Sequence, residues 1–214
     1  TVVTDGPNFK KKIEILETQK HKLDSGFGYL EVKAFVVKPK WRVKLIMKRK
    51  MDILIANNQL KGEAFLDEID GKNPLFIATI ATTETGKIPG LSAAGANPDF
   101  TDFTPPADAE LLLLGKCKSI QGVPITPDGI PTPALITLSA LRLADIPVVI
   151  ANAGVKVKPQ VPYIELGGNS GRDIRTGDSV DNVEEVIERA KTAGEQLAKT
   201  SDYLVIGESI PGGT

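Results

Sequence analysis

Cysteine, histidine and tryptophan are scarce in this sequence, since each occurs once, at Cys117, His21 and Trp41. A single cysteine excludes an internal disulfide framework and a cysteine-built zinc site. A single histidine argues against a histidine metal cluster and against a Ser-His-Asp triad. The sequence also has no run of 18 apolar residues and no charged-then-apolar start of the signal-peptide type. We therefore expect a cytoplasmic protein without metal, cofactor or membrane contact.

Charge is distributed unevenly along the chain, although the net charge of 214 residues is only −1. Residues 1–50 carry 13 Lys and Arg against 5 Asp and Glu, whereas residues 51–214 carry 13 basic and 22 acidic side chains. The basic run at residues 48–50 is followed directly by Met51. The split predicts two parts, a basic N-terminal extension over residues 1–50 and an acidic domain over residues 51–214.

The basic extension has a loose two-residue alternation over residues 29–37 and a cleaner one over residues 41–47, with Pro39 between them. This pattern predicts a short β-ribbon. A basic ribbon with an aromatic side chain can follow a nucleic-acid backbone. The alternative is a solvated appendage or a stretch outside the native fold. We favour that alternative and expect no nucleic-acid partner.

The acidic domain contains short, nearly continuous apolar runs, which are typical of strands covered on both faces by helices. Helices are expected between them. The pair Thr132-Pro133 predicts a helix to about Leu143, and residues 181–184 have capping-box spacing before a helix to about Lys199. The pattern predicts an α/β fold of three layers, α/β/α, with a mainly parallel, doubly wound, Rossmann-like sheet that is incomplete at the C-terminus. The expected strands are residues 51–56, 74–81, 109–114, 147–151, 163–166 and 203–206, with a brief helix at 62–69.

Ligands of parallel sheets bind at the carboxyl ends of the strands, so the loops there are the candidate sites. The loop after residues 203–206 has the sequence GESIPGGT (207–214), and it matches neither a Walker A loop nor the dinucleotide fingerprint. Its glycines allow two interpretations, a phosphate cradle or a plain tight turn. The loop 167–177 adds Arg172 and Arg175, which are either phosphate donors or solvated arginines.

Two further side chains are weaker candidates. Glu84 follows an apolar strand, which suggests an acid, a base or a hydrogen-bond acceptor with a raised pKa, but an exposed loop carboxylate is the safer interpretation. Cys117 lies between lysines that could lower its pKa. Because the acidic domain has no histidine to act as a base, a catalytic thiol is not expected.

Four strings resemble an archaeal and cyanobacterial family related to nicotinate-nucleotide–dimethylbenzimidazole phosphoribosyltransferase, an enzyme of cobalamin nucleotide-loop assembly. They are TETGKIPG (83–90), PTP (131–133), IELGG (164–168) and GESIPGGT (207–214). The resemblance covers about residues 51–214. The order of elements is also similar to that of the enzyme itself, with Asn152 where the enzyme has the aspartate of an Asp-x-Gly turn, and with residues 83–85 where it has Asp-His-Gly.

The resemblance implies a glycosyltransferase that moves phosphoribose from nicotinate mononucleotide to a benzimidazole or purine base. It implies a homodimer and a general base beyond Thr214, and it leaves open a non-catalytic nucleotide-binding or interaction domain of the same fold. The acceptor base would lie beside Glu84 and Ser92. The implied phosphate and ribose residues are Gly207, Glu208, Ser209, Gly212, Gly213 and Thr214, together with Gly171, Arg172 and Arg175.

Overall fold

The computed structural model describes residues 17–22, 29–34 and 55–213, and it divides the chain into two units, Thr1–Asn58 and Gln59–Thr214. The first unit contains an antiparallel ribbon of β1 (Glu17–Lys22) and β2 (Tyr29–Ala34). The sequence predicted a ribbon at residues 29–37 paired with residues 41–47. In the structure residues 29–34 pair with residues 17–22 instead, and residues 41–47 lie outside the described part.

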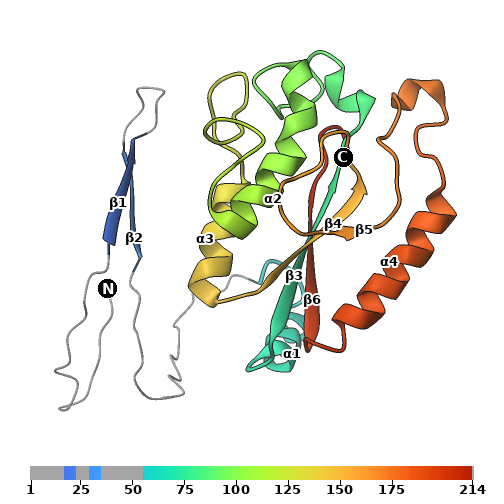
Figure 1. Cartoon of the computed structure of the whole chain (residues 1–214). Coiled ribbons are helices and arrows are strands. Elements are labelled where there is room, and N and C mark those ends of the chain that lie inside the picture. The colour runs from blue at the N-terminus through green and yellow to red at the C-terminus, as the bar shows by residue number, and fades with distance from the viewer. Residues whose placement is uncertain (1–16, 23–28, 35–54, 214) are drawn as a thin grey trace, which may run out of the picture. The chain divides into compact units, whose positions relative to one another are not determined.

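The second unit is built on a four-stranded, all-parallel sheet with the order β5-β4-β3-β6. The chain enters this sheet at β3 and continues through β4 and β5 on one side of it. It then returns to form β6 on the other side of β3 (Figure 1). The connection after β3 leads toward β4, whereas β6 lies on the other side of β3, so the strand order reverses at the β3–β6 boundary, which is the topological switch point. The strands are β3 (Pro74–Ala81), β4 (Val148–Gly154), β5 (Ile164–Glu165) and β6 (Tyr203–Ser209).

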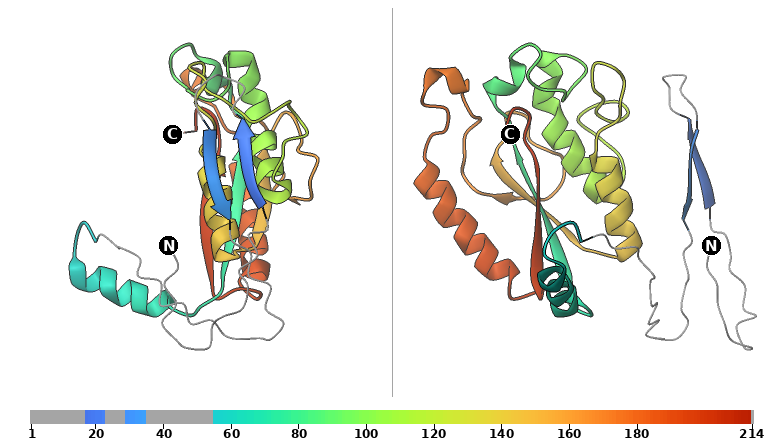
Figure 2. Two further views of the ribbon diagram at one scale, coloured as in Figure 1. Left: turned by 90° about the vertical axis from the view of Figure 1, so that its left-hand side faces the viewer. Right: turned by 180° about the vertical axis from the view of Figure 1, so that it is seen from behind.

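Helices cover both faces of this sheet, as predicted for a doubly wound α/β fold. The pair α2 and α3 lies on one side and α4 on the other, while α1 projects from the base of the sheet (Figure 1, Figure 2). None of the described helices is long and apolar enough to cross a lipid bilayer. The helices are α1 (Gln59–Ile69), α2 (Thr104–Leu114), α3 (Ala134–Ala144) and α4 (Val183–Leu197), with short 3₁₀ turns η1 (Glu84–Lys87), η2 (Pro98–Phe103) and η3 (Ile174–Thr176).

Alternate side chains of β3 enter two separate hydrophobic cores. Ala78 and Ile80 pack with Ala109 of α2 on one face. Ile77 packs on the other face, where Val186 of α4 covers it. Because both faces of the strand are covered, its sequence is a continuous apolar run rather than an alternating one.

One predicted strand is wrong, since residues 109–114 form the second half of helix α2. Pro105 and Pro106 occupy the first turn of this helix, where a missing N–H and a fixed φ are compatible with helical backbone. Residues 104–111 are buried on all sides, so the run lacks the period that marks an exposed helix. The predicted strand at 51–56 falls mostly outside the described residues, and residues 55–56 are not in a strand.

The start of α4 also differs from the prediction, because no capping box forms there. Asn182 is the N-cap residue with a left-handed φ of 45°, and its side chain makes no capping bond. Its amide instead donates to the carbonyl of Gly167 (2.8 Å), and Asp181 is bound to Arg172. The helix at residues 132–143 is confirmed within two residues, with the Thr132 hydroxyl accepting from the N–H of Ala134 (3.2 Å).

Candidate functional site

The loops after β3 and β6 touch each other at the topological switch point. The Thr83 hydroxyl donates to the carbonyl of Pro211 (2.7 Å). A Cβ at Gly86 would lie 2.8 Å from the same carbonyl oxygen, and one at Gly212 would lie 2.4 Å from the Gly86 nitrogen. The two glycines therefore allow two backbones to approach more closely than any side chain would permit.

A third loop, which follows β5, joins the same edge of the sheet. Gly171 donates to the carbonyl of Thr82 and accepts from the N–H of Glu84, both at 2.8 Å. The hydroxyl of Thr85 accepts from the N–H of Ile174 (2.9 Å). The structure thus brings together Glu84, Gly171 and Gly212, which the sequence places far apart.

The backbone of the last loop forms a tight turn. The N–H of Gly213 donates to the carbonyl of Ile210 (2.9 Å), with Pro211 second in the turn and Gly212 third at a φ of 72°. This is the residue pattern of a type II turn, in which the third residue needs a positive φ. The turn interpretation accordingly describes its conformation, while its place at the switch point keeps it a candidate for ligand contact. Thr214 lies outside the described residues.

Packing against the neighbouring strand explains why residue 207 is a glycine, which the sequence did not reveal. A Cβ at this position would lie 2.6 Å from the ring of Phe76 on the neighbouring strand. Glu208, the next residue, is exposed on the opposite face of β6. Of these two predicted ligand residues, only Glu208 therefore has a side chain that a ligand could reach.

Both predicted arginines are bound by carboxylates within their own loop. Arg172 pairs with Asp181 (2.6 Å) and with Asp178 (2.7 Å). Arg175 pairs with Asp173 (2.5 Å), and its hydrogen bonds lower the pKa of the Asp173 carboxyl and raise the pKa of the Arg175 guanidinium. A phosphate at this loop would compete with these carboxylates for the guanidinium groups.

Glu84 lies between two ammonium groups that the sequence did not single out. Its carboxylate pairs with Lys156 and with Lys87 (3.5 Å), and Lys87 also reaches Asp102 (2.8 Å). Lys156 comes two residues after β4, so the strand-end rule could have found it. The hydrogen bond given for Ser92 is local, because its hydroxyl accepts from the N–H of Ala94 (3.2 Å).

A buried carboxyl group under the site connects α2 to the end of β6. Asp108 accepts from the hydroxyls of Ser209 (2.7 Å) and Thr132 (2.9 Å). Burial raises its pKa to about 6, although the two hydroxyls oppose this shift. The hydrogen bond to Asp108 therefore fixes the orientation of the Ser209 hydroxyl. Sequence reasoning missed the pair because it assigned the following residues, 109–114, to a strand.

A second buried carboxylate, Glu110, organises the loops around α2. It accepts from the hydroxyl and N–H of Ser119 (2.6 and 2.7 Å) and from the N–H groups of Lys118 (2.5 Å) and Gln160 (2.8 Å). Burial opposes its ionisation, but these four hydrogen bonds lower its pKa overall. Burial and the charges of Asp108 and Glu110 raise the pKa of Cys117 to about 11. The suggested activation of this thiol by neighbouring lysines is thus wrong.

Asn152 stands where the enzyme named above has the aspartate of its Asp-x-Gly turn. Its side-chain oxygen accepts from the N–H groups of Gly154 and Val155, both at 3.0 Å, and its amide nitrogen donates to Glu165 (2.9 Å). The residue is 2% exposed, so its bonds to the two backbone N–H groups are shielded from water, whereas the bond to Glu165 reaches an exposed carboxylate. An aspartate could make the first two bonds but would repel Glu165.

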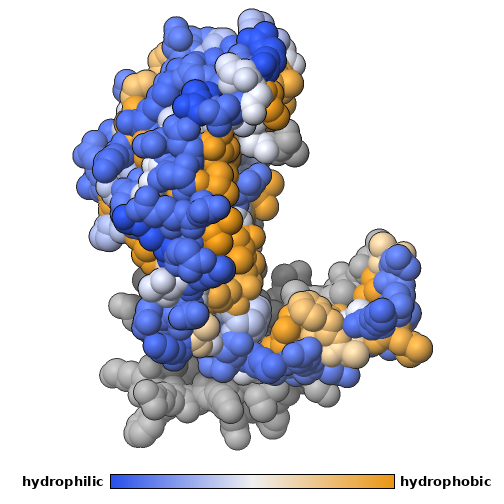
Figure 3. Space-filling view, turned by 90° about the vertical axis from the view of Figure 1, so that its right-hand side faces the viewer, coloured by the Kyte–Doolittle hydropathy of each residue, from blue (hydrophilic) through white to orange (hydrophobic). Residues whose placement is uncertain are grey.

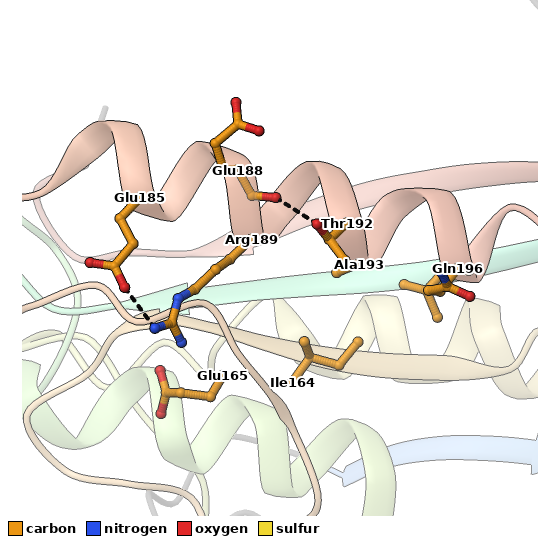
Figure 4. Close-up of a pocket in the computed structure, with 9 residues that line it drawn as sticks. Ile164, Glu165, Glu185, Glu188, Arg189, Thr192, Ala193 and Gln196 are labelled. Carbon is orange, nitrogen blue, oxygen red and sulfur yellow. Dashed lines mark hydrogen bonds and ion pairs between the residues drawn. The ribbon is translucent and has the colours of Figure 1, made fainter.

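An open groove of about 550 Å³ lies between β5 and α4, outside the meeting point of the three loops. In Figure 4 the Arg189 side chain extends from α4 toward the β5 side, with its bond to Glu185 (2.6 Å). The residues that line this groove include none of the predicted site residues. Among the described residues, no group of three or more His, Cys, Asp or Glu side chains could hold a metal ion.

The fold and the meeting loops define a doubly wound α/β protein with a candidate site at the carboxyl edge of a parallel sheet. No protein-family model matches the chain. The chain is similar to UPF0284 proteins of archaea, with 53% identity over 157 residues to that of Archaeoglobus fulgidus and 48% over 156 residues to that of Sulfolobus acidocaldarius. These matches cover 72% and 70% of the chain but 47% and 46% of the relatives, so the chain spans just under half their length. Their name states no activity.

Proposed function

We propose that this chain carries the nicotinate mononucleotide site of a phosphoribosyltransferase similar to nicotinate-nucleotide–dimethylbenzimidazole phosphoribosyltransferase. The observation that carries the proposal is the meeting of the loops after β3, β5 and β6 at the switch point, where parallel sheets bind their ligands. The resemblance adds the substrate, the aromatic acceptor base and a homodimer, and the sequence adds the expectation of a cytoplasmic location. All four stay predictions.

The residues at this edge suit the proposed reaction. The bond between ribose C1′ and the pyridine nitrogen breaks, its electron pair leaves with nicotinate, and a nitrogen of the benzimidazole or purine base attacks C1′. The sugar becomes cation-like during this exchange, so a carboxylate such as Glu84 or Glu208 would stabilise it electrostatically. The attacking nitrogen gives its proton to a general base, which the resemblance places outside residues 1–214. Lys87 and Lys156, which pair with Glu84 and Asp102 in the structure, would exchange these carboxylates for the 5′-phosphate.

Calorimetry with nicotinate mononucleotide tests the proposed site. We expect binding that weakens about tenfold in Lys156→Ala, because one charge-assisted contact to phosphate is worth about 1.4 kcal/mol or more. Lys191→Ala is the matched control, since Lys191 is also ion-paired but lies on α4. No binding at millimolar nucleotide, or equal affinities of the two variants, would argue against the site.

A non-catalytic nucleotide-binding domain is the second candidate, and the pairing of Glu84 favours it. Both lysines beside Glu84 form ion pairs with it, so its carboxylate oxygens are already engaged within the protein. The full-length Archaeoglobus fulgidus relative distinguishes the two candidates in an assay with a panel of aromatic bases. Release of free nicotinate supports the transferase, whereas nucleotide binding without release supports the binding domain.

A further inference from the structure

The edge strand β6 exposes apolar side chains that the rest of the described domain leaves uncovered. Ile206 is 73% exposed and Val205 is 38% exposed, although both belong to the central part of the strand. Among the described residues, β6 pairs only along the edge that faces β3, so alternate N–H and C=O groups point away from the sheet. A long apolar edge of this kind is normally paired or covered, because it otherwise promotes association.

Helix α4 continues this uncovered surface above the sheet. Val186, Ala193 and Leu197 face the core, and the groove-lining residues Glu185 and Arg189 lie on the side of α4 that faces β5. At 100° per residue, Val183 and Ile187 lie on the opposite side of the helix, toward β6. Each of these two side chains is 46% exposed. The apolar side chains of α4 therefore extend beyond the part of the helix that packs on the core.

A space-filling view shows the same surface. In Figure 3 an apolar stripe runs beside the polar outer face of α4, and more apolar atoms lie on α1, which projects from the body. Helix α1 buries none of its residues, and its Leu60 and Phe65 side chains are 80% and 58% exposed. Three elements of one unit, α1, α4 and β6, thus present apolar side chains that no other described part of the chain covers.

We infer that this surface receives a further parallel strand with its accompanying helix, supplied by the portion of the longer relatives that the match to this chain leaves out. The strand pairs with the free edge of β6, and the helix packs on Val183, Ile187 and Ile206. Two facts favour this occupant. The sheet is all-parallel, so the next strand outward from β6 extends it in the same sense, and more than half of each relative is available to supply it.

Hydrogen exchange on this chain and on the full-length Archaeoglobus fulgidus relative tests the inference. In this chain we expect about half of the β6 amides, residues 203–209, to exchange at least about tenfold faster than those of β3, because alternate N–H groups lack a partner. In the relative, the peptide aligned with β6 should exchange as slowly as that aligned with β3. Equally fast exchange of the β6 peptide in both proteins would overturn the inference.

Two isoleucines of nearly equal exposure provide a matched mutational test. Ile206 on β6 is 73% exposed and Ile136 on α3 is 75% exposed. Ile206→Lys and Ile136→Lys should both leave the Tm of this chain nearly unchanged. In the relative, lysine at the position aligned with Ile206 should lower the Tm by about 5 °C or more, whereas lysine at the position aligned with Ile136 should not. Equal Tm changes at the two positions would contradict the inference.

A second copy of this chain is the competing occupant of the β6 edge, and light scattering on this chain tests for it. The inference predicts that Ile206→Lys leaves the oligomeric state unchanged, because β6 takes a strand of different sequence. A dimer of the unmodified chain with slowly exchanging β6 amides, converted to a monomer by Ile206→Lys, would assign the edge to a second copy and overturn the proposed occupant.

Discussion

The two buried carboxyl groups of α2 should respond in opposite ways when each is replaced by its amide. Burial raises the pKa of Asp108 from 3.8 to about 6. Between these two pH values the folded protein therefore keeps a proton that the unfolded chain releases. Its contribution to stability is fully present below pH 4 and is lost as the pH rises through 6. The loss is about 3 kcal/mol, since each pKa unit corresponds to about 1.4 kcal/mol.

Asp108→Asn removes the cost of burying this charge and keeps the hydrogen bonds, because the hydroxyl of Ser209 can rotate to accept from the new amide. The variant should match the unmodified protein at pH 4 and exceed its free energy of unfolding by up to about 3 kcal/mol at pH 8. Urea denaturation at both pH values measures the difference. A variant that is less stable at pH 8 would refute the reasoning.

Glu110→Gln is the contrasting variant, because all four bonds to Glu110 come from donors. In the better orientation the new N–H₂ faces the Ser119 hydroxyl, which can rotate to accept, and the N–H of Gln160, which cannot, so we expect a loss of about 1–3 kcal/mol at pH 7. The pKa of Glu110 is lowered in the folded protein, so its contribution is present above pH 4.5 and is lost as the pH falls below that value. A neutral effect would mean that the four bonds do not stabilise the loops.

Three other predictions concern single side chains. Gly207→Ala should lower the free energy of unfolding by about 1–3 kcal/mol, because the new methyl group meets the Phe76 ring, and urea denaturation would contradict this with a change under about 0.5 kcal/mol. Asn152→Asp should lower the Tm at pH 7 by placing a second carboxylate against Glu165, and a further Glu165→Gln change should recover most of the loss; no recovery would exclude this repulsion as the cause. Cys117 should react slowly with iodoacetamide at pH 8 because its pKa is raised to about 11, and rates like those of an exposed thiol would contradict the assigned environment.

Most of the sheet could be predicted because its strands are short apolar runs whose pattern follows from being covered on both faces. The same rule failed at residues 109–114, because a fully buried helix loses its period and resembles a buried strand. The sequence also predicted that the loops after the strands would gather at one edge, and Glu84, Gly171 and Gly212 do lie together there.

The partners of individual site residues could not be predicted from the sequence. Ser209 meets Asp108, which is 101 positions away, and Lys156 meets Glu84 across 72 positions. Such pairs depend on the order of the strands and on the packing of α2, neither of which local patterns encode. Arg172 illustrates the same limit at short range, since its fit to Asp178 and Asp181 follows from the bend of their loop.

The central claim is that the loops at the switch point form a nucleotide site, and hydrogen exchange with and without nicotinate mononucleotide tests it most directly. We predict that the nucleotide slows exchange in residues 83–87, 171–177 and 207–213 and leaves the groove-lining part of α4, residues 185–197, unchanged. Protection confined to α4, or no protection at nucleotide concentrations that saturate binding in calorimetry, would contradict the claim.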